Sequence, residues 1–270
     1  MALLLVSFGL CRSAFAGSAP DLAAVFNSEF QGHVLVFRKF YQGSPLLYGL
    51  SGKLLKRHKP GSWTSEGVVL VKSVQPVPDG LRFNCHRVEV AFDRKQTHLY
   101  ESGDIEIDIE SGETSLTVDE LNDALTRIFL IPDKGLLAVM PSYWRPFFSS
   151  HKRLYRRLQA QLAQRGDNPS RIEKVPTSIA ALSHAEPQIE SESQVAGRAV
   201  TASFSIIVDK TGHVTEVAIK KPVGLGLDDR AVKVIREWKF KPAESNGVPV
   251  PTLVVAKIRF KLTGGASPGN

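Results

Sequence analysis

The stretch Val200-Thr-Ala-Ser-Phe-Ser-Ile-Ile-Val208 alternates between apolar and polar side chains, which predicts a β-strand with one buried face. The turn Asp209-Lys-Thr-Gly212 follows, and its glycine can adopt a positive φ at little cost. The chain then returns through His213-Val-Thr-Glu-Val-Ala-Ile219, which has the composition of a second strand. We therefore expect a β-hairpin in the C-terminal third of the chain.

A helix is expected after the hairpin, because Leu225-Gly-Leu-Asp-Asp229 places acids where a helix start has free N–H groups. The expected apolar face of this helix consists of Leu227, Ala231, Val234, Ile235 and Trp238. Pro242 ends the helix, and Asn246-Gly247 turns the chain. The last strand is predicted over Leu253–Leu262, with alternate apolar residues on one side and Lys257, Arg259 and Lys261 on the other.

The handedness of the connection fixes the order of these strands. A helical crossover makes strands two and three parallel, so strand three runs antiparallel to strand one and pairs beside it. The prediction is a small ββαβ domain, an antiparallel sheet of order 2-1-3 with the helix on one face. Strand three is then an open edge flanked by basic side chains, and such an edge can accept an extended peptide by strand addition.

Several short motifs of this region stand in a distinctive order and spacing. They are Val208-Asp209 with Gly212-His-Val214, Leu227-Asp228 with Ala231, Trp238-Lys-Phe-Lys-Pro-Ala243, Asn246-Gly-Val-Pro-Val250 and Ile258-Arg-Phe-Lys-Leu262. In this series the segment from Gly197 to Leu262 resembles the C-terminal domain of TonB-family energy transducers. The resemblance implies a periplasmic domain of Gram-negative bacteria that takes part in energy-coupled transmembrane transport. The resemblance further implies that this domain captures the N-terminal box of TonB-dependent outer-membrane receptors by strand pairing.

The resemblance also implies which residues contact a partner. Carried over by position, the pairing edge is Leu253–Leu262, and two further lysines lie beside it. The expected partner-binding residues are Leu253, Val255, Lys257, Arg259, Lys261, Lys239 and Lys241. Inner-membrane motor proteins are expected as partners if the true N-terminus is longer, and a homodimer by strand exchange stays open.

Residues 20–148 predict a β-rich domain with a packed helix, so the fold class of the whole chain is α+β. Strands are expected at His33–Phe37, Val68–Val71, Leu81–Phe83, Val88–Phe92 and Ile105–Ile109. A short helix is expected over Asp21–Phe30, and Thr117-Val-Asp-Glu120 has the spacing of a capping box at the start of another. The sequence does not indicate a function for this domain.

Residues 149–194 predict a basic helix followed by a linker. The helix, Ser150–Arg165, carries Leu154, Leu158 and Leu162 on one stripe. This pattern favours a helix docked on the protein, with binding to a membrane surface as the alternative. The linker, Gly166–Gln194, loses periodicity, the TonB-like domain is expected over 195–263, and the tail 264–270 is expected to fray.

The N-terminus has the pattern of a secretory signal over residues 1–16, with an apolar run from Ala2 to Cys11 and Ala14-Phe-Ala16 before the cleavage point. Ten apolar residues are too few to cross a bilayer, which takes about 20. We therefore expect a cell-envelope protein of the periplasm, or a membrane-anchored one if translation starts upstream. After cleavage the single thiol is Cys85, so no disulfide is expected.

The positive charge is concentrated in the last quarter of the chain. Residues 197–270 contain 12 Lys and Arg against 6 Asp and Glu, whereas residues 1–150 contain 15 against 16. These basic residues alternate with core positions and lack interleaved exposed aromatic residues, which argues against nucleic acid. The charge therefore leaves an anionic lipid or an acidic partner as the alternatives.

No motif for catalysis, a cofactor or a metal was found, and we expect a binding protein and not an enzyme. Cys85 and His86 are neighbours on a strand and point to opposite faces, so they do not chelate one ion. Asp104, Glu106 and Asp108 form a row that favours a solvated strand face over a Ca²⁺ site. The alternative function is an envelope structural or lipid-binding protein that uses the TonB-like domain only for docking. A large apolar cavity between Val68 and Ile109 would favour it.

Overall fold

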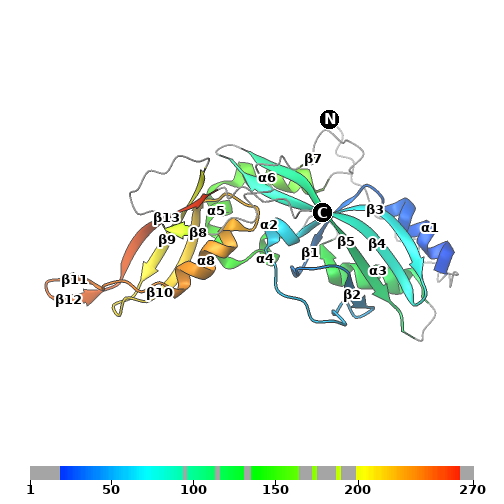
Figure 1. The fold of residues 1–270 in the computed structure, drawn as a ribbon, viewed down its shortest axis with the longest axis horizontal. Coiled ribbons are helices and arrows are strands. Elements are labelled where there is room, and N and C mark those ends of the chain that lie inside the picture. Colours follow the sequence, from blue (N-terminus) through cyan, green and yellow to red (C-terminus); the bar gives the residue numbers. More distant parts are fainter. Residues whose placement is uncertain are drawn as a thin grey trace, which may run out of the picture.

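The computed structural model describes residues 19–93, 96–112, 116–130, 135–163, 172–174, 187–189 and 199–261. The fold is mixed α+β, with a large sheet, a smaller sheet and several helices (Figure 1). The expected signal peptide and the C-terminal tail lie outside the described residues, as does most of the linker. No helix among the described residues is both long and apolar enough to cross a membrane.

The large sheet has the strand order β2-β5-β4-β3-β1-β6, and β7 pairs with β5. Its pairs are antiparallel except β2 with β5 and β5 with β7, which are parallel. The strands are β1 (Val34–Phe37), β2 (Leu46–Gly49), β3 (Val68–Val77), β4 (Gly80–Phe92), β5 (Thr97–Glu110), β6 (Phe129–Leu130) and β7 (Ile172–Lys174). The two strands predicted at 81–83 and 88–92 are one strand, because the polar residues between them still pair with β5.

Both faces of this sheet are buried, which explains the unbroken apolar run Val68-Val-Leu-Val71. Val69 and Val71 pack with helices α1 (Ala19–Phe30) and α3 (Val118–Ile128) in one hydrophobic cluster. Val68 and Leu70 face the other way, into a second cluster with α5 (Arg145–Ser150) and α6 (Lys152–Leu162). A strand covered on both faces needs apolar residues at every position.

A β-bulge lets β5 contribute to both clusters. Between His86 and Val88 of β4 the partner on β5 moves from Asp104 to Glu101, so β5 has one extra residue. Leu99 therefore lies in the cluster with α6, whereas Ile105 lies in the cluster with α1. In an uninterrupted strand these two odd-numbered residues would share a face.

Two local predictions are confirmed by side-chain contacts. Thr117 and Glu120 form a capping box at the start of α3, with the Thr117 hydroxyl accepting from the Glu120 N–H and the Glu120 carboxylate from the Thr117 N–H. The α6 stripe of Leu154, Leu158 and Leu162 is buried, so α6 is docked on the protein. The remaining short helices of the N-terminal region are α2 (Trp63–Glu66), α4 (Leu136–Val139) and the 3₁₀ turn η1 (Ser142–Trp144).

The row of acids on β5 is more buried than predicted. Ile105, Ile107 and Ile109 are buried as expected. Asp108, on the opposite side, is also buried and accepts hydrogen bonds from the Arg82 guanidinium at 2.7 and 2.8 Å. The prediction of a solvated face is therefore wrong for Asp108, because a cross-strand arginine covers it.

The smaller sheet has the order β10-β9-β13-β8, with helix α8 (Leu227–Glu237) alongside it (Figure 1). Its strands are β8 (Pro187–Ile189), β9 (Ala199–Val208), β10 (Val214–Lys221) and β13 (Thr252–Lys261). Asn246 and Gly247, both with positive φ, turn a separate hairpin of β11 (Ala243–Ser245) and β12 (Val248–Val250). The linker therefore supplies a fourth strand, β8, that the sequence analysis does not predict.

The buried face of α8 differs from the predicted one at two positions. Leu227, Ala231 and Ile235 are buried as expected, but Val232 is buried and Val234 is 37% exposed. The helix ends before Trp238, which is half-buried in extended backbone. The first turn of α8 is also contacted by the N-terminal region, through Asp229.

Shortening Leu158 tests whether α6 contributes to the folded core. We expect Leu158→Ala to lower the free energy of unfolding by about 2–5 kcal/mol, since it removes a fully buried side chain and leaves a cavity. The measurement is urea denaturation followed by circular dichroism. Arg156→Ala, at an exposed position of the same helix, is the control and should change it by less than about 0.5 kcal/mol. Equal, small effects of both substitutions would contradict the docking of α6.

Candidate partner-binding site

Strand β13 has two faces of different character. Ala256, Ile258 and Phe260 point into the core that α8 covers and are buried. On the other face Leu253 is 65% exposed and Val255 58% exposed. Single exposed apolar residues are ordinary on a protein surface, but two in alternation on one strand form a continuous apolar strip.

The neighbouring strand extends this strip across the sheet. Leu253 pairs with Ile207 of β9, and Val255 pairs with Ser205. Further along, Lys257 pairs with Ser203 and is exposed, which adds a cation at the end of the strip. The outer face of β13 therefore presents an apolar surface that ends in a positive charge.

The border of β13 is sealed along part of its length by the protein's own chain. Strand β8 pairs antiparallel with β13, opposing residues Ile258, Arg259 and Phe260. β13 pairs with β9 along its whole length on the other side. The expectation of a fully open edge is thus wrong for residues 258–260. Among the described residues, no strand pairs with the outer border of residues 252–257.

The predicted partner-binding residues fall into two groups. Leu253, Val255, Lys257, Arg259 and Lys261 lie on β13, with Arg259 half-buried opposite Gln188 of β8. Lys239 and Lys241 are exposed on the segment that crosses the turn of the β9–β10 hairpin, where Lys239 bridges His213. β13 begins at this end of the sheet, since Thr252 pairs with Val208. The two lysines therefore lie near the start of β13 and not along its length.

The close passage of this segment explains Gly212. Its φ is +88°, and the Phe240 N–H donates to the Gly212 carbonyl at 2.8 Å. A Cβ at this position would lie 2.0 Å from the Phe240 carbonyl oxygen. The turn therefore requires glycine both for its backbone conformation and for space.

A buried carboxylate joins this domain to the N-terminal region. Asp229, in the first turn of α8, accepts hydrogen bonds from the Ser62 hydroxyl, the Tyr143 hydroxyl and, at 3.3 Å, the Trp144 indole N–H. Asp229 is only 6% exposed. All three donors come from the N-terminal region, so the start of α8 is held from outside its own domain.

Main-chain hydrogen bonds reinforce this junction. The Phe92 N–H donates to the Val223 carbonyl at 2.9 Å, and the Leu225 N–H donates to the Val90 carbonyl at 2.9 Å. These bonds form an isolated antiparallel β-bridge between the end of β4 and the loop that connects β10 to α8. The core is also continuous here, because one hydrophobic cluster contains side chains of both regions.

Gly224 and Gly226 permit the approach of the two chains. Both have a positive φ, and a Cβ on Gly224 would lie 2.1 Å from the Val90 carbonyl oxygen. The Gly226 N–H donates to the Thr64 hydroxyl at 2.8 Å. Gly226 is the N-cap of α8, and its N–H, which has no acceptor within the helix, is satisfied by Thr64 of the N-terminal region.

Burial raises the pKa of both carboxyl groups at the start of α8. For Asp228 burial raises the pKa to about 8, although the N–H groups of Val223 and Gly224 donate to its carboxylate and lower it. For Asp229 burial also raises the pKa, and the three donors from the N-terminal region lower it. The junction therefore holds two neighbouring acids whose pKa values burial raises above their ordinary values.

A comparison with known protein families matches the region that contains the smaller sheet. The family model for the C-terminal region of Gram-negative bacterial TonB proteins matches residues 189–262. A curated relative, Protein TonB of Vibrio cholerae serotype O1, is 30% identical over 97 residues, which is 36% of this chain and 38% of that protein. No solved structure matches. Residues 189–262 are thus a TonB C-terminal domain, and the chain spans less than two fifths of this relative's length.

Sequence reasoning missed β8 and the junction around Asp229. The motif Pro187-Gln-Ile189 is too short to show a period, so its pairing with β13 follows only from the folded chain. The Leu227-Asp-Asp229 sequence predicts helix-end acids, and it does not reveal that one of them binds another part of the chain. The one signal in the sequence was that these two adjacent acids stand among apolar residues.

Replacing Asp229 tests the junction. We expect Asp229→Ala to lower the free energy of unfolding by about 2–4 kcal/mol, because it leaves the Ser62, Tyr143 and Trp144 donors without their acceptor. Urea denaturation measures the change. Glu237→Ala, at the exposed end of the same helix, should have an effect below about 0.5 kcal/mol. If both variants are equally stable, Asp229 does not hold the two regions together.

The raised pKa values predict that stability falls as the pH rises. In the folded state Asp228 keeps its proton up to about pH 8, whereas in the unfolded state it loses the proton near 3.8. Between these values the folded state binds more protons, so the free energy of unfolding decreases by up to about 1.4 kcal/mol per pH unit. Asp228→Asn should flatten this dependence between pH 5 and 8. An unchanged slope in that variant would exclude Asp228 as its source.

Proposed function

We propose that this chain is a periplasmic TonB-like protein whose C-terminal domain binds the N-terminal box of TonB-dependent outer-membrane receptors by strand addition. TonB proteins serve energy-coupled transport across the outer membrane as transducers and not as enzymes, and residues 189–262 carry their C-terminal domain. The observation that supports the proposal best is the border of residues 252–257, with the exposed side chains of Leu253 and Val255 beside it.

Strand addition fits this border chemically. An added peptide would form main-chain hydrogen bonds with the outer side of β13, while its alternate side chains reach the apolar strip of Leu253 and Val255. The six residues 252–257 correspond to about 20 Å of extended chain, which suits a peptide of five to six residues. Lys257 at the end of the strip favours a peptide with an acid at the matching position.

The alternative function, a lipid-binding envelope protein, finds less support in the packing. Val68 and Ile109 are both fully buried but belong to different hydrophobic clusters on opposite faces of the large sheet. The apolar side chains of residues 68–109 are packed into these two clusters, one on each face of the sheet. We therefore favour peptide binding over lipid binding by the N-terminal region.

N-methylated peptides test strand addition. A panel of peptides carrying receptor boxes is titrated into the ¹⁵N-labelled full chain, and amide shifts are followed by NMR. We expect shifts over residues 252–257, and we expect N-methylation at alternate peptide residues to abolish them, because it removes the main-chain donors that pair with β13. The complementary set of N-methyl positions should bind normally.

Side-chain variants distinguish peptide binding at β13 from nonspecific binding to exposed apolar residues. We expect Val255→Ser to weaken peptide binding by roughly tenfold, since each buried aliphatic side chain contributes about 1.5–3 kcal/mol. Val234→Ser removes an exposed valine from α8 and should leave binding unchanged. Shifts centred on α8, or equal losses in both variants, would contradict a site on β13.

A further inference from the structure

A cavity lies away from β13, where α5 meets α6. Its volume is about 520 Å³, and it is lined by Ser149, Ser150, His151, Lys152, Arg153, Leu154 and Arg157. This volume is within the range of small-molecule sites, which is about 300–1,000 Å³, and is larger than an inorganic ion needs. None of its seven lining residues is acidic, and three are Lys or Arg.

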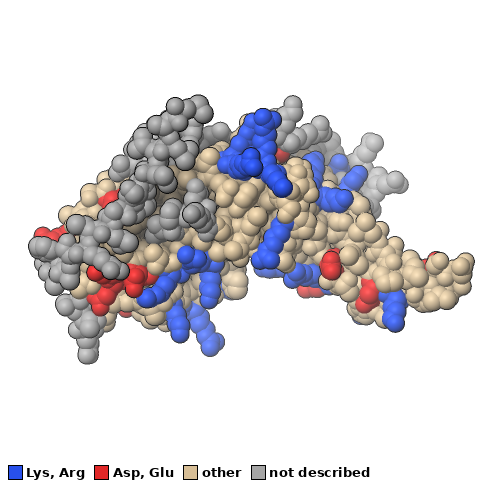
Figure 2. Space-filling model, turned by 180° about the vertical axis from the view of Figure 1, so that it is seen from behind, with Lys and Arg blue, Asp and Glu red and all other residues tan. Residues whose placement is uncertain are grey.

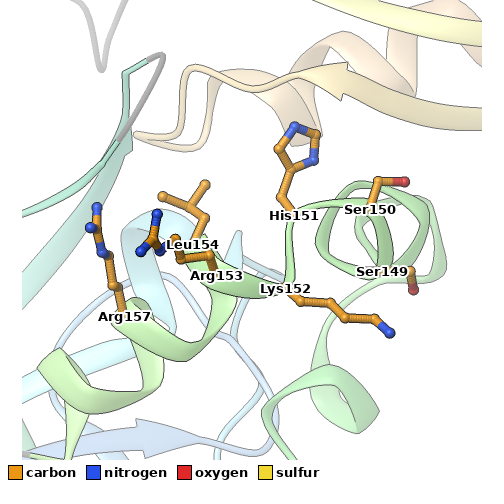
Figure 3. A pocket seen from close by; sticks show the side chains of 7 residues that line it. All are labelled: Ser149, Ser150, His151, Lys152, Arg153, Leu154 and Arg157. Carbon is orange, nitrogen blue, oxygen red and sulfur yellow. The ribbon is translucent and has the colours of Figure 1, made fainter.

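The arginines approach the cavity from one side. Arg153 and Arg157 are four residues apart on α6, and Figure 3 shows both side chains extending from this helix, with Leu154 beside Arg153. Lys152 extends away from this group, toward the serines.

The serines and the histidine also have fixed geometry. The Ser150 hydroxyl donates to the Pro146 carbonyl at 3.0 Å, which commits its proton within α5. The His151 Nδ1 donates to the Phe147 carbonyl at 2.9 Å, and its ring stacks on Phe147 with a centroid distance of 4.4 Å. The histidine ring is therefore held in place as one wall of the cavity, and its Nε2 is the nitrogen left to contact a ligand.

The helix surface around the cavity also favours an anionic ligand. α6 has no acidic residue in its first turn, and Lys152 and Arg153 occupy that turn in place of the acids that usually stabilise a helix start. Arg145 and Arg156 are exposed nearby on α5 and α6. Figure 2 shows groups of Lys and Arg side chains on one face of the molecule, with Asp and Glu side chains in other groups on the same face.

We propose that this cavity binds a phosphate ester, with Arg153 and Arg157 holding the phosphate and Leu154 contacting the group esterified to it. Guanidinium groups bind phosphate oxygens in bidentate pairs, and two of them suit a group with several acceptor oxygens better than a single carboxylate. The cavity volume leaves room for an organic part beside the phosphate. A soluble phosphate ester and the headgroup of a glycerophospholipid share this chemistry.

Binding to the full chain tests the proposal with two probes. Soluble glycerol 3-phosphate is titrated by calorimetry, and vesicles of phosphatidylglycerol are compared with vesicles of phosphatidylcholine by co-sedimentation. Binding of glycerol 3-phosphate supports a soluble ligand. Binding of phosphatidylglycerol vesicles alone supports a lipid headgroup. Binding of neither probe overturns the proposal.

A matched pair of double variants locates the binding. We expect R153Q/R157Q to weaken binding at least about tenfold, since hydrogen bonds to charged groups are among the stronger ones. R145Q/R156Q removes the same charge from exposed positions outside the cavity and should weaken it less than about threefold. Equal losses in the two variants would show diffuse charge attraction and overturn the proposal.

Two further readouts keep the test independent of folding and of peptide binding. The single variant Arg153→Gln should show an intermediate loss, and its thermal unfolding is compared with that of the unsubstituted protein. Receptor-box peptides should bind R153Q/R157Q normally, because β13 is a separate surface. Loss of phosphate binding with peptide binding intact therefore supports this cavity whatever the outcome for β13.

Discussion

The carboxylate of Asp229 is the contact on which the arrangement of the two regions depends. It lies in the first turn of α8 and receives donors from α2's N-cap residue Ser62 and from Tyr143 and Trp144 of η1. Removing a carboxylate from water is costly unless donors replace the water, and here every replacement comes from the N-terminal region. Separation of the two regions would expose Asp229 to water, so the burial of this acid and the docking of the two regions depend on each other.

Docking at one end of α8 leaves the opposite end of the domain exposed. The junction covers the loop before α8 and the start of the helix, and the contacts of η1 and α5 lie on β10. β13 is separated from β10 by β9, so its border faces away from these contacts. The N-terminal region thus fixes the orientation of the domain without occupying residues 252–257.

The sequence predicts local features well and long-range contacts poorly. The capping box of Thr117 and Glu120, the stripe of α6 and the hairpin around Gly212 all depend on residues within a few positions of each other, so their pattern is complete in the sequence. The burial of Val232 in place of Val234 depends on a surface contributed by distant residues, and so does the role of Asp229. The sequence predicted where the open border of β13 lies but not how far it extends. The reason is that β8 has only three residues, too few to show the alternation of a strand.

The short length of β8 decides how β13 meets a partner. Three opposed residues form only a few main-chain hydrogen bonds, each with a net contribution of about 0.5–1.5 kcal/mol, so β8 is held weakly by pairing alone. A peptide on residues 252–257 would run into β8 at Ile258, where continued pairing requires β8 to leave. Its displacement exchanges one set of backbone hydrogen bonds for an equivalent set, which costs little net free energy. Under the proposed strand addition, the sealed part of the border is therefore a replaceable segment, and the peptide would extend along β13 by displacing β8.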